Sequence, residues 1–164
     1  MYPKLTVPDL NLYVRPLENG DIERITPNLR DSDVIEIAAM MGPEFNTQDC
    51  LSISVGISRE SYAIIKDGEP ISLFGVSDSE DVENFGVPWF VGTDGLNDVA
   101  LRIARYSKGW VQHLSKNYEA LYNFVHIPHW QSQKWLQLLG FNVVTQHKYG
   151  FNGEDFYLFI KECS

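Results

Sequence analysis

The 164 residues have the composition of an ordinary globular protein, with 44% apolar and 21% charged residues, and their number fits one domain spanning residues 1–164. Thirteen basic against 22 acidic residues give a net charge of −9 at pH 7, so the chain as a whole repels the phosphate backbones of DNA and RNA. No apolar run approaches the ~20 residues that cross a membrane, and the opening MYPKLTVPDL lacks the pattern of a secretion signal.

The N-terminal third is predicted to form one strand followed by helices. The alternating segment LNLYVRPLE (10–18) favours a strand, and Asp21 is the candidate N-cap of the helical stretch after it. A proline then breaks the pattern, so a second helix is expected over residues 30–41. Residues 47–58 combine β-branched residues with helical spacing, and we favour a helix there.

The rest of the chain alternates strands with two further helices. An Asp-Gly pair at 67–68 predicts a hairpin between the apolar segments on either side of it. The helical pattern is strongest over 97–116, and Asn97 or Asp98 is its expected N-cap. Shorter apolar runs predict the remaining elements: strands at 86–92 and 120–127, a helix at 129–139 and a final hairpin around Asn152-Gly153.

This order of elements predicts the fold class. The strand–helix–strand crossover between 86 and 127 requires one parallel pairing, whereas hairpins make the other pairings antiparallel. We therefore expect an α+β fold with a mixed, mostly antiparallel central sheet and helices on both faces.

Two resemblances point the same way. The segment LYNFVHIPHWQSQKWLQLLGF (121–141), in this order of elements, resembles the GCN5-related N-acetyltransferase (GNAT) fold, which is the acyl-CoA N-acyltransferase fold. The ordered motifs RDSDVIEI (30–37), DGEPISLFGV (67–76), GVPWFVGTDGL (86–96) and KWLQLLGF (134–141) resemble the acetyltransferase-like internal virion proteins of short-tailed phages. The narrower resemblance implies a protein of the phage virion or the host cytoplasm that acts in virion assembly through contacts with protein partners.

The turn before the long helix decides whether acetyl-CoA fits. Members of the GNAT superfamily that bind this cofactor carry Arg/Gln-x-x-Gly-x-Gly/Ala there, and backbone N–H groups of the turn face the pyrophosphate. The corresponding GTDGLND (92–98) lacks a preceding Arg, Lys or Gln and carries Asp94 and Asp98. These carboxylates compete with a pyrophosphate for the same N–H groups and repel it, so we predict a degenerate acyl-CoA site.

If acetyl-CoA does bind, the resemblance assigns its contacts to the strand end and the turn. The backbone of Phe90 and Val91 pairs with the pantetheine arm in that case. The pyrophosphate faces the N–H groups from Gly92 to Asn97, those of Thr93 and Gly95 included.

The catalytic side of the family pattern is also altered. His129 stands where many members carry an asparagine, and Leu136 stands where they carry a general-acid tyrosine. Leucine cannot donate a proton to a departing thiolate. Glu36 and His129 remain as candidate catalytic residues, Glu36 as a base that deprotonates an acceptor amine.

Simpler explanations compete with these roles. Arg30, Asp33 and Glu36 recur every three residues on one predicted helix, and we favour a solvated row of intrahelical ion pairs there. His126 and His129 form an HxxH pair without a third ligand nearby, so we predict no metal site and expect hydrogen-bonding histidines.

The four tryptophans divide into two groups. Trp89 and Trp135 fall on core patterns of a strand and a helix. Trp110 and Trp130 are compatible either with burial or with an exposed anchor for a protein partner, and the sequence does not separate these alternatives.

Three functions follow from these patterns. We favour a phage GNAT-fold protein with a degenerate acyl-CoA site, associated with the virion or its assembly. The alternative is an acetyl-CoA-dependent N-acetyltransferase that transfers an acetyl group to an amine with a divergent pyrophosphate turn. The third is a host-directed inhibitor that uses the fold as a binding surface.

Overall fold

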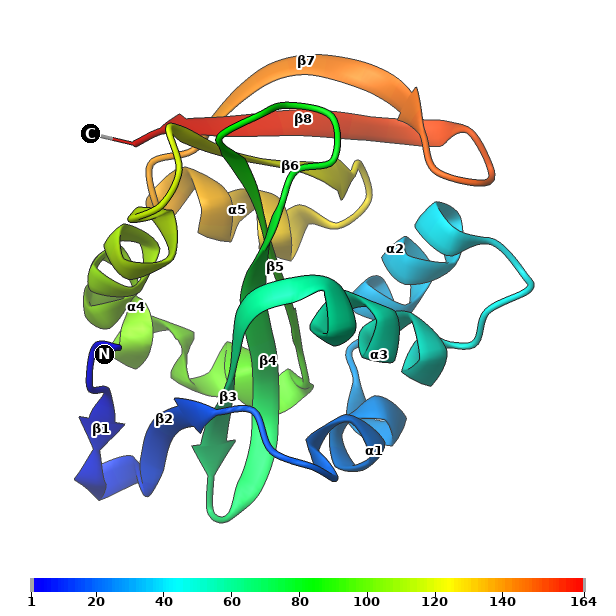
Figure 1. Ribbon diagram of the computed structural model, residues 1–164. Helices are drawn as coiled ribbons and strands as arrows, with labels where there is room; N and C mark the ends of the chain where they lie inside the picture. The colour runs from blue at the N-terminus through cyan, green and yellow to red at the C-terminus, as the bar shows by residue number, and fades with distance from the viewer. Residues whose placement is uncertain (1, 164) are drawn as a thin grey trace.

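A single eight-stranded sheet organises the chain in the computed structural model, which describes residues 2–163 (Figure 1). Its strand order is β1-β2-β3-β4-β5-β6-β8-β7, and only β5 and β6 are parallel neighbours. The predicted mixed, mostly antiparallel sheet is therefore confirmed. The strands are β1 (Thr6–Val7), β2 (Leu12–Pro16), β3 (Ser58–Lys66), β4 (Glu69–Asp78), β5 (Phe85–Gly92), β6 (Ala120–His126), β7 (Asn142–Tyr149) and β8 (Glu154–Glu162).

Helices flank the sheet, and none within residues 2–163 has both the length and the apolar character needed to cross a membrane. The predicted helix over 47–58 is confirmed as α3. The α-helices are α1 (Asp21–Ile25), α2 (Asp31–Met41), α3 (Thr47–Ile57), α4 (Asp94–Ser115) and α5 (Trp130–Leu138), and short 3-10 helices are η1 (Pro8–Leu10) and η2 (Thr26–Asn28).

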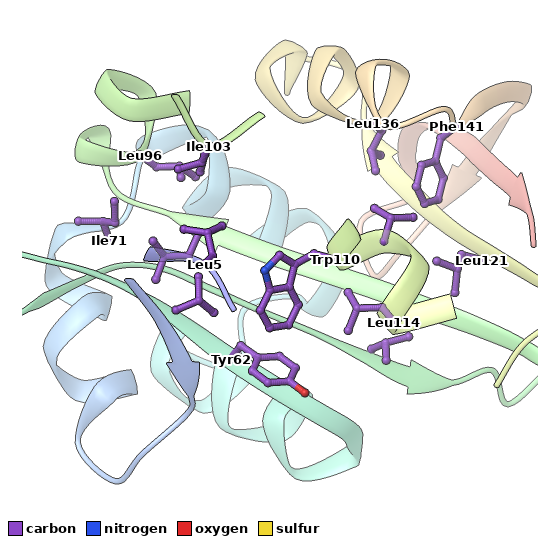
Figure 2. Close-up of a cluster of buried hydrophobic side chains, with 14 of the residues drawn as sticks. Leu5, Tyr62, Ile71, Leu96, Ile103, Trp110, Leu114, Leu121, Leu136 and Phe141 are labelled. Atoms are coloured by element: carbon purple, nitrogen blue, oxygen red, sulfur yellow. The ribbon is translucent and has the colours of Figure 1, made fainter. Parts of the chain in front are cut away.

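Two apolar clusters hold helices against opposite faces of the sheet. On one face, Ile103 of α4 and Leu136 of α5 belong to the same cluster as Tyr62 of β3 (Figure 2). On the other face, Leu51 of α3 packs in a cluster with Ala63 of β3. Because neighbouring residues of a strand point to opposite faces, β3 contributes to both clusters, and the predicted helices on both faces are confirmed.

The parallel strands β5 and β6 separate soon after they begin. They pair only at Phe85 with Ala120 and at Gly86 with Leu121. Just beyond, the side-chain amide of Asn123 donates a hydrogen bond to the carbonyl of Pro88 at 2.7 Å, and proline has no N–H of its own to offer β6. The two strands therefore diverge and leave an opening between them.

The long helix α4 begins earlier than the sequence pattern predicts. It starts at Asp94 with Thr93 as the N-cap, so the prediction of Asn97 or Asp98 as the cap is wrong. Thr93 is fixed by the surrounding chain, since it forms an isolated β-bridge with Leu29 and its N–H donates to the carbonyl of Ile71 at 2.9 Å. The helix can therefore begin directly after β5.

Asp21 is also not a helix N-cap, and that prediction is wrong. Gly20 is the cap of α1, and Asp21 is the first helical residue. Its buried carboxylate accepts hydrogen bonds from the Arg15 guanidinium at 2.7 Å and from the N–H of Glu18 at 2.8 Å. A charged partner on β2 thus holds the side chain that the sequence pattern assigns to capping.

The exposed face of α4 offers a simple test of the helix. A Cβ at Gly109 meets no atom within 4 Å, so Gly109→Ala is expected to raise the free energy of unfolding by about 0.5–1 kcal/mol in urea denaturation. Gly75→Ala serves as the opposite control, because its Cβ lies 2.5 Å from the backbone carbonyl of Glu60. We expect Gly75→Ala to lower the free energy of unfolding by about 1–3 kcal/mol. Equal effects of the two substitutions contradict this description.

Candidate functional site

A cleft of about 1050 Å³ extends from the opening between β5 and β6. Of the candidate residues, Glu36, Phe90, Val91 and Asn97 line it. The others lie outside its lining: Gly92, Thr93, Gly95 and His129.

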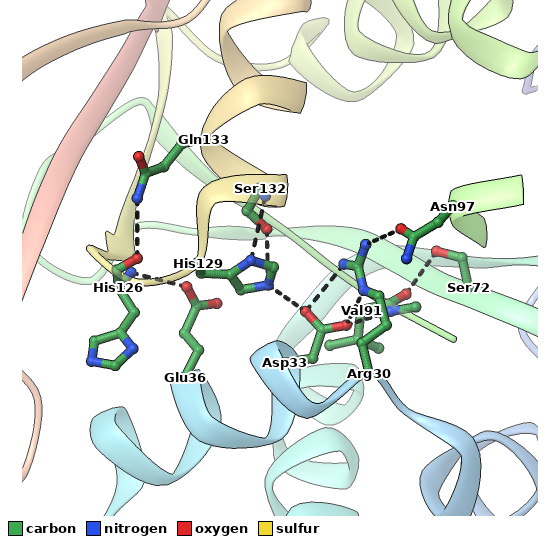
Figure 3. Close-up of polar contacts among 11 residues, drawn as sticks. Arg30, Asp33, Glu36, Ser72, Val91, Asn97, His126, His129, Ser132 and Gln133 are labelled. Atoms are coloured by element: carbon green, nitrogen blue, oxygen red, sulfur yellow. Dashed lines mark hydrogen bonds and ion pairs between the residues drawn. The ribbon is translucent and has the colours of Figure 1, made fainter. Parts of the chain in front are cut away.

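A buried ionic network centred on Asp33 closes one end of this opening (Figure 3). One oxygen of Asp33 accepts from the Arg30 guanidinium and from the N–H of Gly92, both at 2.9 Å. Its other oxygen lies 2.6 Å from Nε2 of His129. Arg30, Asp33 and His129 are each at most 5% exposed.

This burial contradicts the prediction of a solvated row of ion pairs on α2. Arg30 and Asp33 do form an ion pair, but the chain at the start of α2 docks on the end of β5, where the N–H of Arg30 donates to the carbonyl of Gly92 at 2.9 Å. Docking removes both side chains from water. The three-residue spacing along the helix thus correctly predicted the ion pair, but the prediction that the pair is exposed to solvent is wrong.

The charges in the network follow from its hydrogen bonds. Burial of Asp33 opposes ionisation, but hydrogen bonds from His129 and Arg30 outweigh it and hold the pKa of this carboxyl below its ordinary value. The N–H of Ser132 donates to Nδ1 of His129, so Nε2 carries the ring proton and donates it to Asp33. A buried carboxylate that accepts hydrogen bonds from a guanidinium and an imidazole is a stable structural arrangement.

Ser132, His129 and Asp33 nevertheless do not form a nucleophilic triad. The hydroxyl of Ser132 and the carboxylate of Asp33 both approach Nε2 of His129, at 3.2 and 2.6 Å. A triad requires the nucleophile and the orienting acid to contact opposite nitrogens of the histidine ring. Asp33 and His129 are also buried and lie outside the lining of the cleft.

Glu36 is placed differently, at the wall of the cleft. Its Oε2 accepts a hydrogen bond from the N–H of His126 at 2.9 Å, so it reaches from α2 to β6 (Figure 3). Burial raises the pKa of this carboxyl above its ordinary value, against the opposing influence of the hydrogen bond from the N–H of His126. A carboxyl with a raised pKa in a cleft has the property that a general base requires.

This raised pKa predicts a pH-dependent effect of Glu36→Gln. The folded protein holds the Glu36 proton more tightly than the unfolded chain, so native stability falls as pH rises through the folded pKa. Glutamine keeps an acceptor for His126 without the charge. We expect the variant to unfold at a higher temperature than the wild type at pH 7, and the advantage to vanish near pH 4. Glu44→Gln, at an exposed site, is the control. The same difference in unfolding temperature between Glu36→Gln and the wild type at both pH values contradicts the expectation.

Several backbone groups that face the opening already have partners. The N–H of Gly92 donates to Asp33 of α2, and its carbonyl accepts from the N–H of Arg30, the residue before α2. On β6, the N–H of Phe124 donates to its neighbour Asn123 and that of His126 to Glu36. Because bonding directions alternate along an antiparallel pair, Phe90 points its N–H and carbonyl into the opening, as Gly92 does.

The same alternation directs the backbone N–H and carbonyl of Val91 away from the opening. Val91 is opposite Leu73 on β4, and its carbonyl accepts a hydrogen bond from the hydroxyl of Ser72 at 2.7 Å. Of the two residues assigned to a pantetheine arm, Phe90 therefore offers its backbone to the cleft, and Val91 offers only its side chain.

In the turn between β5 and α4, two backbone N–H groups already have partners. Thr93 alone separates the last residue of β5 from the first residue of α4. The N–H groups of Gly92 and Thr93 are bound to Asp33 and to the carbonyl of Ile71. Asp94, in the first turn of α4, is exposed and places a negative charge at the remaining N–H groups.

Other positions of the family pattern have structural roles. Leu136 is 7% exposed in the core between α5 and the sheet, so it replaces the general acid by an apolar contact. Asn97 accepts a hydrogen bond from the Arg30 guanidinium at 3.1 Å. Gly95 lies against Thr93, whose hydroxyl is 3.3 Å from a Cβ built at this position.

The HxxH pair forms two separate hydrogen-bonded sites. His126 contacts Glu154 at 2.9 Å, and His129 contacts Asp33. Within residues 2–163, no group of three or more His, Cys, Asp or Glu side chains is arranged to hold a metal ion. The expectation of hydrogen-bonding histidines is confirmed.

The sequence missed Asp33 as the centre of this site. Its partners lie on three different elements, and His129 is 96 residues away along the chain. No local spacing reports such a contact. Only the pairing of Arg30 with Asp33 on α2 could be read locally.

Comparison with known proteins extends these observations. No protein-family model matches the sequence, and no curated protein sequence matches it. The structure does match solved structures of acetyltransferases. Ard1 from Thermoplasma volcanium has a TM-score of 0.72 at 12% identity, over 94% of this chain and 99% of its own.

Two further solved structures agree. The GCN5-related N-acetyltransferase from Kribbella flavida has a TM-score of 0.67 at 14% identity, over 95% of this chain and 99% of its own. The ribosomal-protein-S5-alanine acetyltransferase from Vibrio fischeri has a TM-score of 0.65 at 14% identity, over 98% and 96%. Identities this low establish the fold alone. The resemblance in fold is thereby confirmed: this chain has the GNAT acyltransferase fold.

Proposed function

We propose that this chain is a GNAT-fold binding protein whose acyl-CoA opening is closed by its own side chains, and that it acts through contacts with a protein partner. The observation that carries the proposal is the closure itself. Asp33 and Glu36 of α2 accept the N–H groups of Gly92 and His126, which lie on the two diverging strands. A cofactor has to break these contacts before it can use the same groups.

The short turn supports the same conclusion independently. A pyrophosphate needs several free N–H groups and local positive charge. Here one residue connects β5 to α4, and the guanidinium that donates to Asn97 of α4, that of Arg30, is paired with Asp33. Exposed Asp94 and Asp98 add repulsion at the helix start.

A titration with acetyl-CoA tests this proposal directly. We expect the unfolding temperature to stay constant up to millimolar cofactor, with a known acetyl-CoA-binding GNAT enzyme measured in parallel. A ligand at a hundredfold excess over its Kd stabilises its protein by about 2.7 kcal/mol, which is easily detected. A rise in unfolding temperature with saturation overturns the proposal.

A second function, acetyl-CoA-dependent N-acetyl transfer, is favoured by one observation. Phe90 directs its backbone groups into the same cleft that Glu36 lines, and Glu36 has the raised pKa of a base for an acceptor amine. On this alternative the candidate contacts from Phe90 to Asn97 stay as the sequence assigns them. If acetyl-CoA binds, Asp94→Arg should tighten it, and Glu36→Gln should abolish release of free thiol in the presence of amines.

The virion location rests on the sequence resemblance to phage proteins and stays a prediction. The three solved structures described above carry the names of bacterial or archaeal acetyltransferases and do not bear on it. Mass spectrometry of purified phage particles tests the location. Absence of this chain from the particles favours a role in assembly or on a host protein instead.

A further inference from the structure

The part of the cleft that faces α2 and α3 has an aromatic wall. Phe124 of β6 stacks on Tyr149 of β7, with ring centroids 3.9 Å apart, and lies 6.4 Å from the ring of Tyr122. Trp89 of β5 lines the same cleft. We call Trp89, Tyr122, Phe124 and Tyr149 the aromatic wall.

Acidic side chains surround this wall. Glu36 lines the cleft from α2, and Glu80 and Asp81 line it from the loop between β4 and β5. A contact of 2.6 Å between the hydroxyls of Ser79 and Tyr122 holds that loop against the wall. Within residues 2–163 neither Glu80 nor Asp81 forms an ion pair, and both are exposed at the rim.

Positive charge is scarce in the same region. Asp78, also at the rim, is paired with Arg59 at 3.0 Å, which cancels its charge. Of the basic residues that line the cleft, Arg30 is paired with Asp33, and Lys134 belongs to α5 on the opposite face of the sheet. Three carboxylates therefore dominate the field at the aromatic wall.

Apolar side chains of α2 and α3 line the cleft opposite the aromatic wall. Met40 and Met41 of α2 and Ile53 and Ile57 of α3 line the cleft. Methionine side chains adapt to irregular ligands, and aliphatic surface accommodates the stems of long charged side chains. Aromatic faces attract the cationic heads.

From this arrangement we infer that the aromatic wall and its acidic rim bind a lysine- or arginine-rich segment of the protein partner. The inference rests on the proposed binding function and names the chemistry of its partner. The carboxylates lie at separate points, Glu36 inside the cleft and Glu80 and Asp81 at its rim, so an extended chain with several cations fits them better than one compact cation. The net charge of −9 further favours a basic partner.

A labelled decapeptide of alternating lysine and alanine, followed by fluorescence anisotropy in 0.15 M salt, tests this inference. We expect saturable binding by the full chain and none by the matched glutamate–alanine peptide. Asp81→Lys should weaken binding at least tenfold. Glu83→Lys is the matched control, because Glu83 is exposed on the same loop but does not line the cleft.

The aromatic wall is tested separately. Tyr149→Leu keeps apolar bulk but removes the ring, and about threefold weaker binding is expected. No binding at millimolar peptide, equal losses from Asp81→Lys and Glu83→Lys, or spermine bound as tightly as the peptide each overturns the inference. Neither charge substitution touches the turn after β5, so the acetyl-CoA titration reports on the proposed function independently of these results.

Discussion

Asp33→Ala is expected to lower the free energy of unfolding by about 3–5 kcal/mol, because it leaves the buried Arg30 guanidinium without a counterion. It also removes the acceptor for the N–H of Gly92 and for Nε2 of His129. Each unsatisfied buried donor carries a further cost. Urea unfolding of the variant and the wild type at pH 7 measures the loss.

Asp31→Ala is the matched control for this experiment. Asp31 begins the same helix, but it is exposed, so Asp31→Ala should lower the free energy of unfolding by less than about 1 kcal/mol. Adding Arg30→Met to Asp33→Ala should recover part of the stability, since no unpaired charge is then buried. Similar losses from Asp31→Ala and Asp33→Ala contradict the buried network.

The same pair predicts a pH dependence with a defined sign. The pKa of Asp33 is lowered in the folded protein, so its charge stabilises the fold above the ordinary pKa of about 3.9. That contribution is lost as pH falls through the folded pKa. The stability difference between wild type and Asp33→Ala should therefore shrink below about pH 4.

Trp110→Ala is expected to cost about 3–5 kcal/mol, whereas Trp130→Ala should cost less than about 1 kcal/mol. Trp110 is 5% exposed, and its ring contacts Tyr62 edge-on with centroids 4.7 Å apart (Figure 2). Trp130 is 60% exposed and has the ammonium of Lys134 over its ring. Urea unfolding of both variants is the measurement.

This comparison uses one residue type at two degrees of burial, so it isolates burial from chemistry. For a chain of this length, 3–5 kcal/mol lowers the unfolding temperature by roughly 6–20 °C. Equal losses at the two positions contradict the packing of α4 on β3. The structure thus resolves the alternative that the sequence leaves open, with Trp110 in the core and Trp130 on the surface.

Local pattern was a reliable guide to the elements and their order. Period-two and helical spacings correctly located the α-helices and the strands other than β1, and the single crossover correctly predicted the parallel pairing of β5 and β6. Asp67-Gly68 correctly predicted the β3–β4 hairpin, with both residues at positive φ. These features depend on residues that are near one another in the chain, which explains why the sequence alone is sufficient for them.

Caps and burial were less predictable. Thr93 begins α4 because Leu29 and Ile71 hold it from other elements, and Asp21 binds Arg15 instead of capping α1. The sequence predicted the ion pair between Arg30 and Asp33, but it did not predict that both side chains are buried. In each case a partner outside the local segment outweighs the preference of the residue itself.

The sequence by itself therefore determined the order of the elements, the α+β class, the acidic charge and the poor match of GTDGLND to a pyrophosphate turn. Only the tertiary structure decided that side chains of α2 bind N–H groups of both β5 and β6, and that aromatic and acidic residues from separate elements meet in one cleft. Periodicity is a property of neighbouring residues and can be read along the chain. Closure and convergence depend on contacts such as that between Asp33 and His129, which exist only once the chain has packed.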